Sequence, residues 1–246
     1  MGYGSAMDTA GSDNAGGFVD RLWEAGRLSE AEFHAACVLH HRAFAQPGRT
    51  LEQVIQKKRP MWRPGDEPDT EAQPGGAEGR ESPWRIGGRV VSLTPPRRYV
   101  VLGGDEVDGA AEADGPGDGG GVGLLANAAT LSRRIETAAG ERVVLGLLDV
   151  ATDPRTRGRG WRLGERVVRR AFAELENAAA DCFLLQTGGA RRFYEKLGAR
   201  AVDNCFVDRG DPDATPAPPF HEPHVMIYPA SADWPTGEVD LRGPGW

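Results

Sequence analysis

Residues 149–163 read DVATDPRTRGRGWRL, and this stretch decides the fold. The residues that lead into it, 142–152 (RVVLGLLDVAT), predict a buried strand. Those that follow predict a helix over 161–177, because apolar residues recur there at helical spacing with arginine and glutamate between them. The chain therefore passes from a strand through a short turn directly into its clearest helix.

The turn itself has the composition of an anion pocket. Four arginines, at 155, 157, 159 and 162, lie within eight residues of a chain whose net charge is −7. Gly158 and Gly160 allow a ligand to approach the backbone closely and permit positive φ. The helix start adds unpaired N–H groups and a partial positive charge. The pattern predicts a pyrophosphate site. The alternative is a surface turn whose arginines only face solvent, and the motifs of a Walker loop and of a dinucleotide-binding GxGxxG turn are both absent.

The segments on either side predict a mixed α/β layer. Ser29 with Glu32 and Thr50 with Gln53 fit capping boxes, so we expect helices to begin there and to end before Pro47 and near Pro60. Residues 122–137 and 142–152 read as an antiparallel hairpin. The other expected elements are a strand at 97–102, a strand at 181–187, a helix at 190–197 that Gly198 ends, and strands at about 200–207 and 224–228.

Composition narrows the function classes. The 246 residues suit one moderately large domain, and a pI near 5.3 argues against a nucleic-acid partner. Three cysteines without a CxxC pair indicate neither a disulfide framework nor a cysteine zinc site. The apolar runs are too short to span a membrane, and no signal peptide is visible, so we expect a cytoplasmic protein without a membrane partner.

Three stretches are too polar and too rich in glycine, proline or acid to bury much apolar surface. We expect a disordered tail at 1–17 and mobile insertions at 63–83 and 103–121. The remaining residues from 18 to 230 are expected to form one catalytic domain, and 231–246 a tail that packs near its active site.

Two motifs resemble those of the GNAT acetyltransferases. Arg155-x-x-Gly158-x-Gly160 is similar to the family's Q/R-x-x-G-x-G/A signature at a strand-to-helix junction. Phe193-Tyr-Glu-Lys-Leu-Gly198 resembles its second recurrent motif. The resemblance covers about residues 122–207. It implies an α/β GNAT fold, a mixed and mostly antiparallel sheet whose central strands splay apart between flanking helices.

The resemblance also implies acetyl-CoA as co-substrate and no metal. A primary amine then attacks the thioester directly, without a covalent enzyme intermediate. The strand end would pair with the pantetheine and the turn would hold the pyrophosphate. The implied cofactor-binding residues are Val150, Ala151, Thr152, Arg157, Gly158, Arg159, Gly160, Trp161 and Arg162.

Two catalytic roles follow from the resemblance. Tyr194 occupies the motif position from which many members protonate the thiolate, and the alternative is an aromatic that packs the short helix. The strand positions where several members carry a general base hold Val144 and Gly146, which cannot titrate. Asp149 is the ionisable group left on residues 143–152, either as the base or as a structural carboxylate.

The last residues, from Asp233 to Trp246, are acidic and aromatic. They are similar to the tails of aminoglycoside 2′-N-acetyltransferases, in which terminal carboxylates hold a cationic substrate. Asp240 and Trp246 are therefore candidate substrate-binding residues, and the alternative is a strap that packs on the surface. His221 and His224 form an HxxH without helical spacing or a third ligand, so we interpret the pair as structural or exposed.

These observations predict an N-acetyltransferase that acts on the primary amine of a small molecule. The alternative is a catalytically silent GNAT domain that senses acyl-CoA or binds a partner. Nucleic-acid binding through the arginines of 155–170 would need those side chains to be free. The sequence leaves the acceptor and the oligomeric state open, with a homodimer as one alternative.

Overall fold

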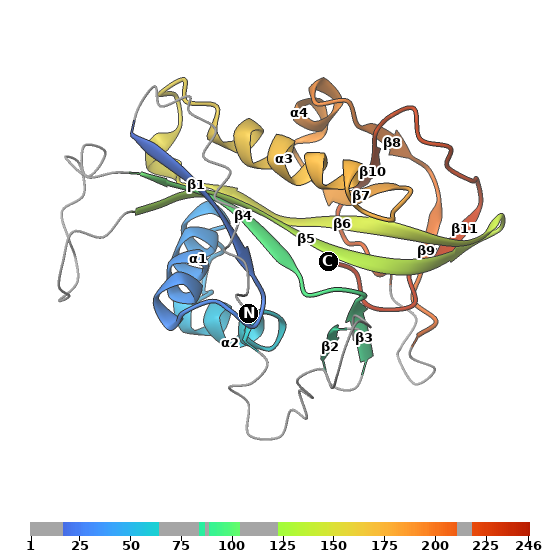
Figure 1. Ribbon diagram of the computed structural model, residues 1–246, viewed down its shortest axis with the longest axis horizontal. Helices are drawn as coiled ribbons and strands as arrows, with labels where there is room; N and C mark the ends of the chain where they lie inside the picture. Colours follow the sequence, from blue (N-terminus) through green and yellow to red (C-terminus); the bar gives the residue numbers. More distant parts are fainter. Residues whose placement is uncertain (1–16, 64–83, 87–88, 104–122, 211–217) are drawn as a thin grey trace, which may run out of the picture.

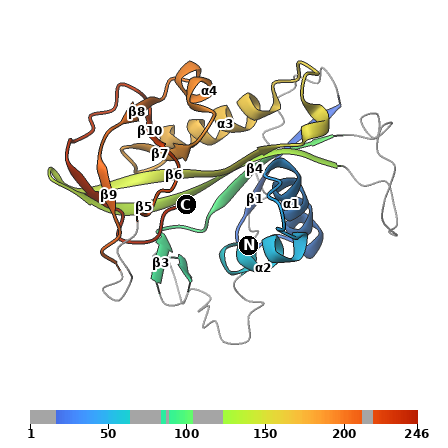
Figure 2. The same ribbon diagram turned by 180° about the vertical axis from the view of Figure 1, so that it is seen from behind.

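The computed structural model describes residues 17–63, 84–86, 89–103, 123–210 and 218–246. Within them, nine strands form one mixed, mostly antiparallel sheet whose main path runs β1-β4-β5-β6-β7-β10-β8. Helices α1 and α2 cover one face, and α3 and α4 cover the other (Figures 1 and 2). The α/β sheet flanked by helices that the sequence predicts is confirmed. The expectations for 1–16, 64–83 and 104–122 lie outside the described residues.

The helices and strands follow the expected order with some additions. The helices are α1 (Glu30–Ala43), α2 (Leu51–Trp62), α3 (Leu163–Ala173) and α4 (Arg191–Lys196). The strands of the large sheet are β1 (Phe18–Glu24), β4 (Arg97–Gly103), β5 (Gly123–Thr137), β6 (Gly140–Thr152), β7 (Cys182–Thr187), β8 (Arg200–Val202), β9 (Cys205–Val207), β10 (His224–Tyr228) and β11 (Glu238–Asp240). Strands β2 (Trp84–Ile86) and β3 (Arg89–Ser92) form a separate hairpin.

Four details differ from the sequence analysis. The helix expected at 161–177 begins at Leu163 and gives way to a 3-10 turn at Glu174–Glu176. Pro60 lies inside α2 instead of ending it. The strand expected over 200–207 is two strands, of which β8 pairs with β10 and β9 with β11. Strands β1, β2, β3 and β11 were not anticipated, because short edge strands carry little periodic signal.

The hairpin of β5 and β6 forms the centre of the large sheet. Its register runs from Thr137 opposite Gly140 to Ala126 opposite Thr152. Gly140 closes the turn with φ of 104°, a conformation that favours glycine. The register shifts between Asn127 and Ala129, and the shift faces Asp149, whose φ of 52° is unusual for a residue with a side chain. This bulge lies on β6 shortly before the predicted turn.

Apolar side chains pack on both faces of the sheet. The face under α3 and α4 holds a cluster that includes Leu145, Leu147, Val167, Phe183 and Tyr194. The face toward α1 and α2 holds a second cluster, centred on buried aromatic and aliphatic side chains of both helices and of β4 to β6. In the described part of the chain, no helix combines the length and the apolar character that crossing a membrane requires.

Candidate functional site

Strands β6 and β7 separate partway along their length. They pair in parallel only from Val144–Cys182 to Gly146–Leu184. Beyond this point β6 continues to Thr152 and β7 to Thr187, without pairing between them in the described residues. The expected splay is therefore present. Val150, Ala151 and Thr152 lie on the part of β6 that pairs with β5 alone, and such an edge can accept an extended ligand.

Asp153 anchors the turn that follows β6. Its side chain is 1% exposed and accepts hydrogen bonds from the backbone N–H of Arg155 at 2.9 Å and from the Arg155 guanidinium at 2.6–3.1 Å. Arg42 of α1 lies 3.7 Å away. Burial alone would raise the pKa of Asp153, but the bonds from Arg155 outweigh burial and lower it. The signature arginine thus fixes the start of the turn.

The turn leaves backbone donors open. Gly158 and Gly160 have φ of 76° and 75°, and a Cβ added at either would meet no atom within 4 Å. The N–H groups of Gly158, Gly160, Trp161 and Arg162 have no hydrogen-bond partner among the described residues. Arg162 is the N-cap of α3 and offers no side-chain cap. Open space, unpaired donors and a helix start coincide here, so the site fits a pyrophosphate.

The arginines of this region divide into two groups. Arg162 pairs with Glu165, and Arg166 and Arg170 both pair with Asp20 of β1. Arg157 and Arg159, by contrast, have no ion pair in the described part of the chain, and Arg159 lies 5.0 Å over the ring of Trp161. Most side chains that a nucleic-acid surface would need are therefore engaged within the protein, while two remain for a ligand at the turn.

Asp149 lies in a buried charged cluster between the sheet and helices α1 and α2. Its Oδ1 accepts a 2.5 Å bond from Lys58 Nζ, and its Oδ2 accepts a 3.1 Å bond from Arg98 Nη2. His40 Nδ1 lies 3.6 Å from Oδ1. Burial alone would raise the pKa of Asp149, but Lys58 and Arg98 outweigh burial and hold it well below its usual range. Asp149 is a paired carboxylate at the bulge of β6.

Tyr194 lies on α4 with 6% of its surface exposed, among the apolar side chains of β6, β7 and α3. Its hydroxyl makes no hydrogen bond to any described residue, and burial raises its pKa above the ordinary value. Tyr99 is the useful contrast, because its hydroxyl donates a 2.8 Å bond to Glu174. Tyr194 thus presents a protonated phenol without a protein partner.

The tail brings Trp246 to the point where β6 and β7 separate. Its ring packs on Gly146, where a Cβ would lie 2.6 Å from the indole, and its Nε1 donates to Leu184 O at 3.3 Å. Gln186 Nε2 donates to the backbone oxygen of Trp246 at 2.5 Å. Arg133 lies 4.9 Å over the indole. The C-terminal end accordingly lies beneath the centre of the sheet (Figure 1).

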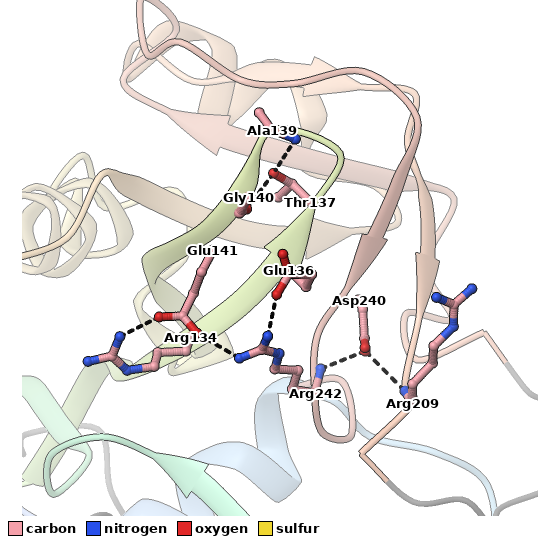
Figure 3. A network of polar contacts seen from close by, with 9 residues as sticks. All are labelled: Arg134, Glu136, Thr137, Ala139, Gly140, Glu141, Arg209, Asp240 and Arg242. Atoms are coloured by element: carbon pink, nitrogen blue, oxygen red, sulfur yellow. Dashed lines mark hydrogen bonds and ion pairs between the residues drawn. The ribbon is translucent and has the colours of Figure 1, made fainter.

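Asp240 lies elsewhere, beside the turn of the β5–β6 hairpin. Its Oδ1 accepts bonds from the backbone N–H groups of Arg209 and Arg242, at 3.0 and 2.8 Å (Figure 3). The guanidinium of Arg242 in turn binds Glu136 and Glu141. The structure therefore brings Asp149 and Trp246 to the separating strands, and it places Asp240 in a structural contact at the other end of the hairpin.

The sequence analysis missed Lys58 and Arg98, although one signal was available. Strand alternation places Arg98 on the same face as Val100 and Leu102, both buried against α1 and α2. A cation on an apolar face needs a buried partner, and its sequence position does not say which. The histidines of the HxxH lie at the start of β10 and just before it, and no group of three metal-binding side chains forms among the described residues.

No family model matches the chain, and no curated protein is found to be similar to it. Solved structures do resemble it at 14% identity. One is a GNAT family acetyltransferase from Brucella melitensis in complex with acetyl-CoA, which covers 90% of this chain and 95% of its own at a TM-score of 0.44. Another is glucosamine-6-phosphate N-acetyltransferase from Arabidopsis thaliana, with 73% and 90% covered at 0.41.

A third similar structure is a probable N-acyltransferase from Enterococcus faecalis. It is 14% identical over 74% of this chain, at a TM-score of 0.43. The match covers only 32% of that longer protein. The present chain thus spans about a third of the length of this relative.

Proposed function

We propose that this chain is a GNAT-type N-acyltransferase that moves an acetyl group from acetyl-CoA to a primary amine. One observation carries the proposal: four unpartnered N–H groups at 158–162 follow directly on a strand that has separated from its neighbour. The turn offers donors to a pyrophosphate, and the free edge of β6 offers backbone groups to an extended arm. The motif that resembles the GNAT signature lies on these residues.

The chain's own residues divide the task between them. Acetyl-CoA supplies the acetyl thioester. The N–H groups of the turn, with Arg157 and Arg159, would neutralise the phosphates. Val150, Ala151 and Thr152 would align the arm along β6. The amine attacks the thioester carbonyl, the carbon–sulfur bond breaks, and Tyr194 donates its proton to the leaving thiolate. Its buried phenol without a partner supports this role.

Asp149 supports the base role less well than the sequence suggests. A general base works best with a pKa near the working pH, and ion pairs with Lys58 and Arg98 keep this pKa far below that range. We propose that Asp149 instead holds those two cations in place beside the acyl group. Because no other carboxylate lies on the separated part of β6, the acceptor would lose its proton to water.

The unpartnered N–H groups of the turn and the free edge of β6 also favour a second candidate function, an acyl-CoA sensor without turnover. Both functions need the turn and the free edge of β6, so they share the binding prediction. They differ in the acceptor pocket, for which we propose the indole of Trp246 on Gly146 as one wall. A wall of this kind suits a small molecule. The contacts of Asp240 with backbone N–H groups support no direct substrate role.

Binding is tested first, by calorimetric titration with acetyl-CoA. Gly158→Asp and Gly160→Asp should each weaken binding at least about tenfold, because each places an anion where phosphate lies. Gly48→Asp is the matched control, since Gly48 also has positive φ and open space around it but lies between α1 and α2. Binding that survives both turn variants, or no binding by the wild type, would overturn the proposal.

Turnover is tested by thiol release from acetyl-CoA over a panel of amines, aminoglycosides and peptides. Release that depends on an amine supports the transferase. Tight binding of acetyl-CoA with no release for any amine supports the sensor.

A further inference from the structure

The cluster around Asp149 is not balanced in charge. One carboxylate faces two cations, the ammonium of Lys58 at 2.5 Å and the guanidinium of Arg98 at 3.1 Å. Burial lowers the pKa of His40 to about 4, so this imidazole is neutral at pH 7. Burial raises the pKa of the Cys37 thiol to about 11, so it is neutral too. The described residues of the cluster therefore carry one net positive charge.

This charge is held out of water. The side chains of Lys58, Arg98 and Asp149 are 15%, 2% and 10% exposed. Burial lowers the pKa of both Lys58 and Arg98, which means that desolvation penalises their charged forms. The nearest further carboxylate on β6 and its turn, Asp153, is engaged by Arg155 and Arg42. An unmatched buried cation is costly, and a bound anion would offset the cost.

The cluster also has hydrogen-bond donors left over. The ammonium of Lys58 has three donors, and among the described residues it uses one, toward Asp149. Arg98 Nε is buried without a hydrogen-bond partner, and the guanidinium carbon lies 4.2 Å over the ring of Trp62. Arg98 is therefore fixed in place, while Lys58, the more exposed of the two cations, can turn a donor toward a ligand.

The position of the cluster decides what the ligand is. Asp149 lies three residues beyond Gly146, on the part of β6 that has left β7. That is where the proposed function places the acyl group, and Lys58 reaches this point from α2. We propose that Lys58, held by Asp149 and backed by Arg98, binds a carboxylate of the acceptor, so that the acceptor is an amino acid or a similar amino-carboxylate. This inference rests on the proposed transferase function.

A single carboxylate is the anion that fits best. The cluster's excess is one charge, which a carboxylate neutralises and a phosphate dianion would overshoot. Acceptors with several positive charges, such as aminoglycosides, would be repelled instead, because the cluster is desolvated and already cationic. The structure thus favours an acceptor class different from the one that the tail resemblance indicates.

The test compares amines that differ only in the carboxylate. Each amino acid is assayed against its carboxamide, with acetyl-CoA saturating. Loss of the carboxylate makes the amine less basic and so leaves more of it unprotonated at neutral pH, which by itself favours the amide. We expect the acid to have the higher kcat/KM, by about 10- to 100-fold, the range of a charge-assisted bond.

Lys58→Met is the decisive variant. It removes the excess charge and leaves Asp149 paired with Arg98 alone, so the fold should persist. We expect it to lower kcat/KM for the acid far more than for the amide, so that the advantage of the acid over the amide disappears. Lys57→Met is the matched control, because Lys57 is the exposed neighbour on the same helix. If Lys58→Met does not fold, Lys58→Gln provides the same comparison.

Equal kcat/KM for acid and amide in the wild type would overturn the inference and leave the proposed function intact. If no amine turns over, calorimetric titration with the amino acids and their amides still tests the carboxylate site without catalysis. Heat with the acids that Lys58→Met abolishes supports the inference in that case. Heat with inorganic phosphate but not with any amino acid would overturn it in favour of a phosphate ligand.

Discussion

The two ends of β6 carry ion pairs of opposite kinds. Near its start, at the hairpin turn, Arg134 and Arg242 meet Glu136 and Glu141, two cations against two carboxylates (Figure 3). These side chains are 40–55% exposed. Near its end, Lys58 and Arg98 share the carboxylate of Asp149, and these side chains are only 2–15% exposed. The charges at the turn are balanced and exposed to water, whereas the charges near Asp149 are unbalanced and largely shielded from water.

This difference distinguishes ion pairs that only hold the structure together from a candidate ligand-binding site. Exposed balanced pairs contribute little to stability, so the network at the turn mainly fastens the tail strand β11 to the hairpin. Buried unbalanced charge is expensive, and proteins keep such groups where a ligand supplies the missing charge. The separation of β6 from β7 lies at the same end. We therefore expect substitutions at the two ends to differ in size and in kind.

The largest expected effect is that of Asp149→Asn. It leaves two buried cations without a carboxylate, and breaking such a pair costs about 3–5 kcal/mol. Glu141→Gln at the other end should cost much less, because its partners Arg134 and Arg242 are exposed to water. Urea unfolding of both variants at pH 7 measures the contrast. Equal losses would mean that burial does not distinguish the two ends.

The second effect is a pH dependence of the unfolding free energy between about pH 6.5 and 4, which comes from His40 at the buried end. Burial first, and then Lys58, lower the pKa of His40 to about 4, while an unfolded histidine titrates near pH 6.5. Between these two pH values, His40 binds a proton in the unfolded chain but not in the folded chain. The free energy of unfolding therefore falls as pH drops from about 6.5 to 4, by at most about 3 kcal/mol.

His40→Gln should flatten this fall, and urea unfolding at several pH values measures it. Asp149 attracts the protonated imidazole, whereas Lys58, Arg49 and Arg98 repel it, and repulsion with burial prevails. His221→Gln is the control, because that side chain is 79% exposed. The same slope in the wild type and in His40→Gln would assign the acid sensitivity to other groups.

The third effect tests whether the Tyr194 hydroxyl takes part in the proposed acetyl transfer. Tyr194→Phe keeps the ring and removes the hydroxyl that has no protein partner. Turnover on an accepted amine should fall at least about tenfold, with acetyl-CoA affinity and Tm little changed. Tyr99→Phe should do the reverse, since it breaks the bond to Glu174 and lowers Tm without slowing turnover. Unchanged turnover in Tyr194→Phe would make its hydroxyl dispensable.

Which features the sequence predicts depends on how far apart the contacting residues lie along the chain. The turn at 157–162, the hairpin and both capping boxes could be predicted because each depends on residues close in sequence. The cluster could not, because Asp149 meets Lys58 across 91 positions and Arg98 across 51. A spacing pattern identifies neither partner, and only the packing of α1 and α2 on the sheet brings them together.

The position of the C-terminal tail likewise depends on contacts with residues far away in the sequence. Its aromatic residues predict that it packs somewhere, and Trp234 and Trp246 do pack. Where they pack depends on features that a pattern does not reveal: Gly146 has no side chain and admits the indole, and β11 pairs with β5 and β9. For this reason Asp240 and Trp246, close in sequence, lie at different places along the hairpin: Asp240 is opposite Glu136 beside the turn, and Trp246 is on Gly146 in the middle of β6.

The smallest expected effect is at the exposed end, with Arg242→Ala. The guanidinium binds Glu136 and Glu141, and all three side chains are about 40% exposed, so water and salt screen the pairs. We expect a loss of about 0.5–1 kcal/mol in the free energy of unfolding at low salt, which shrinks as salt rises toward 1 M. Asp149→Asn should keep most of its loss at the same salt concentration, because its partners are buried. Urea unfolding of both variants across the salt series measures the contrast. A loss in Arg242→Ala that exceeds about 2 kcal/mol, or that salt does not reduce, would contradict this expectation. It would show that the ion pairs at the β5–β6 hairpin turn do more than attach the tail strand β11.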